Sequence, residues 1–202
     1  MGRSKYHHGD LRRALIDGAV GLVREQGLQG WTLRGVARRV GVSHAAPYHH
    51  FSDVEALLGA VTALGFDQLR EEMEAALLGV DDRGDRLRAV ARSYAAFGAN
   101  NPGLYQVMFR EVRSDAQGSS DGRDAGMRAL AVFVQEVAAG QDEGLLAAGP
   151  PMDRVLPAWS MLHGFVSLAV LGPLPGMGLL GRPFDELVED IGSAAVAVLL
   201  GP

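Results

Sequence analysis

The sequence predicts an all-α fold with a small N-terminal three-helix unit and a larger C-terminal helical unit. Apolar residues recur at helical spacing along most of the chain, and no segment alternates between apolar and polar residues as a half-buried strand would. With 202 residues and 48% hydrophobic content, the chain can bury a substantial core. We expect a folded, two-part helical protein.

The charge is divided unevenly between these two parts. Residues 1–52 carry eight Lys and Arg residues against three Asp and Glu residues, although the whole chain has a net charge of −5. Five of the six histidines also lie in this basic part. A basic head on an acidic body is typical of a protein whose head approaches a polyanion, and it favours nucleic acid as the partner.

Two further features bear on where the protein acts. The chain has no cysteine, which excludes disulfides and thiolate metal sites, and residues 1–10 lack the apolar stretch of a secretory signal. Proline and glycine residues interrupt the long uncharged stretch between Arg154 and Arg182, so we expect no membrane span there. The expected location is cytoplasmic.

The head is predicted to begin with two helices. Apolar residues from Leu11 to Val23 keep helical spacing, and Gly27 offers a stop. Thr32 can cap a second, short helix, and Gly41 can adopt the positive φ angle of a tight turn after it.

A third, very short helix is predicted over residues 43–48, with Ser43 as its cap. Pro47 lies near enough to its start to be tolerated, and Val42 and Phe51 flank it as core anchors. The sequence Ser52-Asp53-Val54-Glu55 is typical of a capping box, which predicts a long helix from there to about Leu78.

Later segments predict the helices of the body. The expected helices cover residues 87–97, 103–112, 125–139, 153–171 and 184–200. Residues 114–122 and 172–181 are rich in Gly, Ser or Pro and are expected to form loops.

Residues 32–51 have the features of a helix-turn-helix. The small Ala37 lets the second helix approach the third, Gly41 turns the chain, and Val36, Val40 and Val42 fill the space between them. We therefore predict a DNA-binding domain over residues 1–52, followed by a second domain over residues 53–202.

With Tyr48-His49-His50-Phe51 and Leu57-Leu58 added, residues 9–58 resemble the tetracycline-repressor (TetR) family of transcriptional regulators. The resemblance implies a homodimer that binds a palindromic double-stranded DNA operator without a cofactor and releases the operator on binding a small-molecule effector. It makes residues 53–202 the effector-binding and dimerisation domain. It assigns contacts with the DNA backbone to Thr32, Arg34, Ser43, Tyr48 and His50, and places His44, Ala45 and Ala46 toward base edges. His49 belongs to the same segment, and Arg3 and Lys5 are expected to form an arm that reaches the adjacent groove or the DNA backbone. The chain departs from the family at Val54, where a lysine is common.

The C-terminal part has a weaker resemblance to one TetR subgroup, at residues 101–109 and at Trp159-Ser160-Met161-Leu162-His163-Gly164. We expect an effector pocket whose walls are aromatic with one polar group: Tyr94, Phe97, Tyr105, Phe109, Trp159 and His163. The alternative is that Trp159 is core and His163 is a buried histidine satisfied by a backbone carbonyl.

The last two helices predict dimerisation. Residues 155–171 are apolar on nearly every side, and Ile191, Ala194, Ala195 and Val198 form a second apolar stripe. We expect these helices to pair with their two-fold mates as a four-helix bundle.

Three other functions fit single features of the sequence. Residues 41–45 resemble a hydrolase nucleophile elbow but lack its second glycine. The His7-His8 and His49-His50 pairs could suggest a metal site, but adjacent histidines on a helix point apart, and we expect neither a metal nor a cofactor. An architectural DNA-binding protein would gain nothing from an acidic body.

Overall fold

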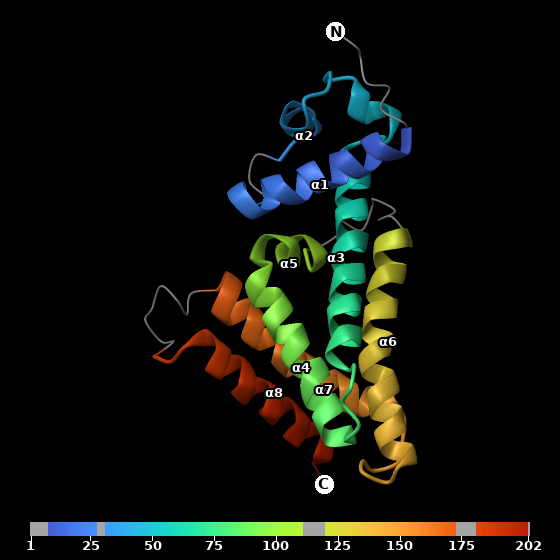
Figure 1. Cartoon of the computed structure of the whole chain (residues 1–202), viewed down its shortest axis with the longest axis vertical. Coiled ribbons are helices and arrows are strands. Elements are labelled where there is room, and N and C mark those ends of the chain that lie inside the picture. The colour runs from blue at the N-terminus through green and yellow to red at the C-terminus, as the bar shows by residue number, and fades with distance from the viewer. Residues whose placement is uncertain (1–7, 28–30, 111–119, 173–180, 202) are drawn as a thin grey trace. The chain divides into compact units, whose positions relative to one another are not determined.

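The computed structural model describes residues 8–27, 31–110, 120–172 and 181–201, and within these ranges every regular element is a helix (Figure 1). The predicted all-α class is confirmed. The α-helices are α1 (His8–Gln26), α2 (Leu33–Val40), α3 (Val54–Ala76), α4 (Arg83–Asn100), α5 (Pro102–Met108), α6 (Ser120–Asp142), α7 (Pro151–Val166) and α8 (Phe184–Leu200). A short 3-10 helix, η1 (Ala46–His49), and a π-helical turn, η2 (Ser167–Leu171), complete the described elements.

The chain divides into two compact units. The first contains residues 1–65 and 103–124, and the second contains residues 66–102 and 125–202. Compactness therefore divides the chain within α3, whereas the functional boundary predicted at residues 52 and 53 stays a prediction.

In the first unit, α1 begins at His8, before the predicted start at Leu11, and ends where Gly27 adopts a φ of 66°. Leu15, Ala19 and Val23 are buried along one face, as their helical spacing predicts. Thr32 caps α2 by accepting a 3.0 Å hydrogen bond from the Gly35 amide. Gly41 then turns the chain with a φ of 76°. Both predicted ends of α2 are confirmed.

The third, very short helix predicted over residues 43–48 is only partly confirmed, because the structure has no α-helix there. The segment is a turn followed by the 3-10 helix η1, whose N-cap is Ala45 without a side-chain hydrogen bond. Pro47 explains the difference, because a proline has no amide hydrogen and therefore cannot extend an α-helical ladder. Pro47 is buried, so its ring serves as an anchor for the segment.

The predicted capping box at the start of α3 is also wrong by one residue. Asp53, rather than Ser52, caps the helix by accepting a 2.8 Å hydrogen bond from the Ala56 amide. Glu55 pairs instead with Arg110, which lies far from it in sequence. The long helix itself is confirmed, although it ends at Ala76 rather than near Leu78.

Helix α5 packs closely in the first unit. A Cβ atom on Gly103 would lie 2.6 Å from the carbonyl oxygen of Val23 on α1, and one on Gly65 of α3 would lie 2.7 Å from Met108. Gly103 meets backbone, an approach that only glycine allows, whereas a side chain at position 65 would require the Met108 side chain to shift; α5 thus lies directly against both α1 and α3.

In the second unit, α4, α7 and α8 pack side by side (Figure 1). Gly192 of α8 lies against Arg92 of α4, where an added Cβ would be 2.7 Å from the Arg92 Cγ atom. Arg154 of α7 donates a 2.7 Å hydrogen bond to the carbonyl oxygen of Leu199, near the end of α8. The bounds of α8 match the predicted residues 184–200.

A charged cluster joins α4 to α6 in the second unit. Glu136 is 7% exposed and accepts hydrogen bonds from Arg86 at 2.8 and 2.9 Å, and it also pairs with Arg83. Arg83 donates a further 2.7 Å hydrogen bond to Glu143. Burial by itself would raise the pKa of Glu136, but the two arginines outweigh it and hold this pKa below its ordinary value.

Two loop predictions fall largely outside the described residues. Residues 173–180 lie outside them, as do residues 111–119, while residues 120–122, also predicted as loop, belong to α6. Of the helices in the described ranges, none combines the length and apolar content needed to cross a membrane.

Candidate functional site

The segment between α2 and α3 presents a polar, partly aromatic surface. Ser43, His44, Ala45 and His49 are exposed, and Tyr48 is 56% exposed although it is a large aromatic residue. Ala46 and His50 are partly exposed. The residues predicted to face DNA in this segment are therefore accessible.

Buried residues hold this segment from its inner side. Pro47 is buried, Phe51 is 4% exposed, and the guanidinium carbon of Arg12 lies 5.3 Å from the centre of the Phe51 ring. Backbone hydrogen bonds from the amides of His50 and Phe51 to the Pro47 carbonyl, both 2.9 Å, close the turn. The exposed side chains thus stand on a turn whose backbone is fixed.

Helix α2 adds polar groups to the same unit. Thr32 and Arg34 are exposed, as is Arg38 one turn further along. Thr32 already accepts a hydrogen bond from the Gly35 amide, but its hydroxyl hydrogen can still be donated. Lys5, predicted to form part of an N-terminal arm, lies outside the described residues.

Arg39 differs from these cations. Its guanidinium donates two hydrogen bonds, of 2.7 and 2.8 Å, to the two carboxylate oxygens of Glu25 on α1. Hydrogen bonding to Arg39 lowers the pKa of Glu25. The sequence shows Arg39 only as one more basic residue of the head.

In the second unit, two of the predicted effector residues meet. The Tyr94 hydroxyl on α4 lies 3.0 Å from Nδ1 of His163 on α7, and the Trp159 ring lies 6.1 Å from the His163 ring, centre to centre. Tyr94 is nearly buried, while Trp159 and His163 are partly exposed. Burial lowers the pKa of His163, which keeps its ring neutral near pH 7.

The other predicted effector residues are distributed over both units. Phe97 is fully buried in the second unit, near the end of α4. Tyr105 and Phe109 belong to the first unit, where their ring centres lie 4.6 Å apart and Tyr105 is 1% exposed. The contacts described thus unite Tyr94, Trp159 and His163, and they pair Tyr105 with Phe109.

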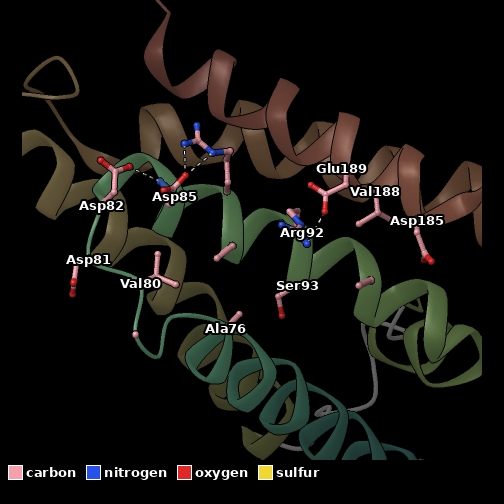
Figure 2. Close-up of a pocket in the computed structure, with 14 residues that line it drawn as sticks. Ala76, Val80, Asp81, Asp82, Asp85, Arg92, Ser93, Asp185, Val188 and Glu189 are labelled. Carbon is pink, nitrogen blue, oxygen red and sulfur yellow. Dashed lines mark hydrogen bonds and ion pairs between the residues drawn. The ribbon is translucent and has the colours of Figure 1, made fainter.

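Sequence reasoning missed a groove of about 860 Å³ in the second unit, between α4, α8 and the connection that precedes α4 (Figure 2). Its charged groups are mostly acidic, and several are already paired. Arg92 forms a 2.6 Å ion pair with Glu189, and Asp82 caps α4 by accepting a 2.9 Å hydrogen bond from the Asp85 amide. The only sequence signal for the groove is the acidic run that follows Gly79.

Helix α7, the π-helical turn η2 after it and helix α8 also carry exposed apolar side chains. Leu156 is 51% exposed, Leu168 52% and Val198 42%. Of the predicted stripe on α8, Ala194 and Val198 are exposed, while Ala195 is buried against its own unit. A Cβ atom on Gly164 of α7 would meet open space.

Within the described ranges, no group of three or more His, Cys, Asp or Glu side chains is arranged to hold a metal ion. His49 and His50 belong to η1 and the turn after it, in the segment described above.

Comparisons with known families match both parts of the chain. Residues 15–61 match the family described as bacterial regulatory proteins of the tetR family. Residues 87–191 match the tetracyclin repressor-like C-terminal domain.

Relatives in sequence are named as regulators. An uncharacterized HTH-type transcriptional regulator of Haemophilus influenzae is 32% identical over 129 residues, which are 63% of this chain and 61% of that protein. The HTH-type transcriptional regulator BetI of Rhizobium meliloti is 29% identical over 145 residues, which are 70% of this chain and 68% of that protein. The chain thus spans less than two thirds of the Haemophilus protein.

Solved structures share the fold over nearly the whole chain. A protein of unknown function from Rhodococcus sp. RHA1 has a TM-score of 0.82 and 32% identity, and the match covers 98% of this chain and all of that one. A putative TetR-family transcriptional regulator from Syntrophomonas wolfei has a TM-score of 0.74 with 17% identity, over 96% of this chain and 97% of that one.

Proposed function

Because the chain belongs to the tetracycline-repressor family of bacterial transcriptional regulators, we propose that it is a repressor that binds a palindromic DNA operator as a homodimer. A small apolar or amphipathic effector releases it from the operator. Regulators of this family bind DNA operators as homodimers, and a response to a ligand is typical of them. The site of action is the cytoplasm, where the operator is.

The observation that carries this proposal is the exposed surface of residues 43–50. Tyr48 is 56% exposed on η1, while the adjacent Pro47 is buried and fixes the backbone beneath it. The Tyr48 hydroxyl and the Ser43 hydroxyl can both donate hydrogen bonds to phosphate oxygens. The imidazoles of His49 and His50 can do the same. A fixed turn with donors on its outer side suits the DNA backbone.

Sequence preference would come from neighbouring positions. His44 and Ala45 are exposed just before η1, where the family resemblance places base contacts. The imidazole of His44 can donate to or accept from a base edge, whereas the Ala45 methyl group can contact only an apolar edge. We therefore assign more of the sequence preference to His44 than to the arginines of α2.

The exposed apolar residues of α7 and α8 support a homodimer. Leu156 and Val198 are large enough to lose substantial apolar area when covered, and the open space at Gly164 lets a partner helix approach closely. A two-fold partner would place two heads on successive major grooves, about 34–36 Å apart.

The effector site proposed here is centred on Tyr94, Trp159 and His163. Trp159 supplies an apolar face, and the hydrogen-bonded pair of Tyr94 and His163 supplies a neutral polar group. Such a lining favours an uncharged or amphipathic molecule over a small ion. Phe97, in the same unit, remains a proposed lining residue, while Tyr105 and Phe109 belong to the first unit and stay predictions from the sequence.

The alternatives from single sequence features have less support. The named relatives are transcriptional regulators, so the chain is not an enzyme, and the hydrolase-like residues 41–45 form the turn after α2 instead of a strand-to-helix elbow. An architectural protein without an effector would have no need of a regulator's C-terminal domain, which residues 87–191 match.

A test of DNA binding uses duplexes that the purified chain selects from a randomised pool. Tyr48→Ala is expected to weaken binding to all duplexes alike, because a phosphate contact carries no sequence information. His44→Ala is expected to change which duplexes are selected. Intact binding by Tyr48→Ala would show that the segment is wrongly assigned.

A second test addresses the effector. Candidate apolar metabolites that bind the wild-type chain should lower its affinity for the selected duplex by roughly one to two decades, a coupling of about 1–3 kcal/mol. His163→Ala should reduce that coupling while leaving DNA binding intact without metabolite. Metabolites that bind near His163 yet leave operator affinity unchanged would refute the proposed release.

A further inference from the structure

Helix α1 contains two interior glycines, Gly18 and Gly21, which lie one turn apart on the same side. Glycine within a helix costs about 1 kcal/mol relative to alanine, so two of them in one helix need a structural reason. A Cβ atom on Gly18 would lie 2.6 Å from the Val40 Cγ2 atom, and one on Gly21 would lie 2.6 Å from the Arg39 Nη2 atom. Both glycines therefore make room for the last two residues of α2.

The guanidinium of Arg39 occupies the space beside Gly21. Its Nε and Cζ atoms, like Nη2, would lie too close to a Cβ on Gly21, at 2.8 and 2.9 Å. It reaches Glu25 one turn further along α1 and binds both carboxylate oxygens. A bidentate pair of this kind fixes an angle as well as a distance.

We propose that Gly18, Gly21, Glu25 and Arg39 form an α1–α2 clamp in which Arg39 is a positioning residue for DNA recognition and not a phosphate ligand. This inference rests on the proposed DNA-binding function. It goes beyond that function by giving Arg39 a role different from the phosphate contacts expected of exposed cations on α2.

The placement of the neighbouring arginines agrees with this division. Arg34 and Arg38 are four residues apart and share one exposed side of α2. Arg39 is rotated by about 100° from Arg38 around the helix axis, toward α1. Arg34 and Arg38 therefore stay accessible to phosphate, while the charge of Arg39 is matched by Glu25.

The clamp connects to the recognition segment through backbone hydrogen bonds. The Gly41 amide donates to the Arg38 carbonyl at 3.3 Å, and the Val42 amide donates to the Ala37 carbonyl at 3.0 Å. These bonds tie residues 41 and 42, which lead directly into residues 43–50, to the end of α2. Fixing the last turn of α2 on α1 thus also fixes where residues 43–50 begin.

The test compares two variants of the full chain. Gly21→Ala keeps every charge and improves helix propensity, but its methyl group displaces the Arg39 guanidinium. Glu25→Gln removes the bidentate acceptor. The matched control is Asp17→Asn, which removes an exposed carboxylate from the same helix, where the nearest cation is Arg13 at 3.9 Å.

Two readouts are measured for each variant. The first is affinity for a duplex that the wild-type chain has selected from a randomised pool, relative to sheared genomic DNA. The second is hydrogen exchange of the α2 backbone amides without DNA, which reports on the clamp independently of any DNA binding.

The clamp predicts that Gly21→Ala and Glu25→Gln both lower affinity for the selected duplex by about fivefold, the effect of losing one well-formed exposed ion pair. Both variants should also exchange α2 amides faster, whereas Asp17→Asn should leave this exchange unchanged and, having lost a negative charge, should bind the duplex no more weakly than the wild type. If Glu25→Gln instead binds tighter, as Asp17→Asn would from its lost negative charge, Arg39 is an ordinary phosphate-facing cation and the proposal is overturned.

Failure of the proposed DNA-binding function would give a different result from failure of the clamp. A wild-type chain that selects no duplex would refute DNA recognition, while the exchange rates would still decide whether the clamp exists. Unchanged exchange in both variants would overturn the clamp whatever the DNA result.

Discussion

Replacing Glu136 with glutamine is expected to destabilise the second unit. Glu136 is 7% exposed and joins α6 to α4 through Arg83 and Arg86, whose side chains are 19% and 23% exposed. The substitution keeps the size of the side chain but removes its charge. Two largely buried arginines then lose their shared carboxylate.

The structure limits the size of this effect. Breaking a buried pair by removing one partner costs about 3–5 kcal/mol when the remaining charge has no other acceptor. Arg83 keeps Glu143, and Arg86 keeps the Val80 carbonyl at 2.9 Å. We therefore expect a loss of about 2–3 kcal/mol, which corresponds to a fall in Tm of roughly 5–10 °C for a chain of this size.

The assay is urea and thermal unfolding followed by far-UV circular dichroism, at one protomer concentration because dimerisation would shift the midpoint. Glu143→Gln is the matched control, since it removes the exposed end of the same cluster and should change Tm far less. The Arg83 and Arg86 side chains lower the pKa of Glu136, so its contribution is present above the ordinary value of 4.5 and is lost as pH falls. The difference between wild type and Glu136→Gln should shrink below pH 4.5. Equal midpoints at pH 7 would refute the reasoning.

Three other predictions concern separate parts of the chain. Burial lowers the pKa of His163 below 6.5, so as pH falls the unfolded chain takes up a proton at this residue more readily than the folded chain does. The free energy of unfolding should therefore fall as pH drops below 6.5. His163→Gln should flatten that dependence in a pH series of urea titrations. Leu156→Glu should convert dimer to monomer in sedimentation analysis, whereas Leu78→Glu, at a residue 80% exposed outside α7 and α8, should leave the dimer intact. Gly103→Ala should lower the unfolding free energy by about 1–3 kcal/mol, because its Cβ would lie 2.6 Å from the Val23 carbonyl oxygen; an unchanged urea midpoint would contradict the close packing of α5 on α1.

Local signals in the sequence predicted most helix positions well. Thr32 and Gly41 define the ends of α2 in the sequence and in the structure, because a cap and a left-handed turn depend only on nearby residues. The α8 helix was predicted with its observed bounds, since Pro183 and Gly201 flank a strongly periodic apolar segment.

Predictions failed where two local signals competed. Ser52 and Asp53 are both good caps, and the pattern Ser52 to Glu55 favoured the serine, but Asp53 makes the hydrogen bond. Glu55 was therefore available for Arg110, a partner that sequence spacing does not reveal. At Pro47, the apolar pattern predicted a helix, but the missing amide hydrogen produced a 3-10 turn.

Contacts between distant segments could not be predicted from the sequence. Nothing in the sequence distinguishes Arg39 from the other basic residues of the head, because its partner Glu25 lies fourteen positions away. The hydrogen bond between Tyr94 and His163 spans 69 positions, so the sequence could propose both residues for one pocket without giving their geometry. The acidic groove beside α4 likewise depends on how α8 packs.

The most direct measurement of the central claim is the salt dependence of binding to a duplex selected by the wild-type chain. If residues 43–50 recognise DNA, the logarithm of the binding constant falls linearly with the logarithm of salt concentration, and sheared genomic DNA binds at least about a thousandfold more weakly at physiological salt. Binding that is insensitive to salt, or equal for both DNAs, would contradict the assignment of residues 43–50 as the DNA-recognition surface.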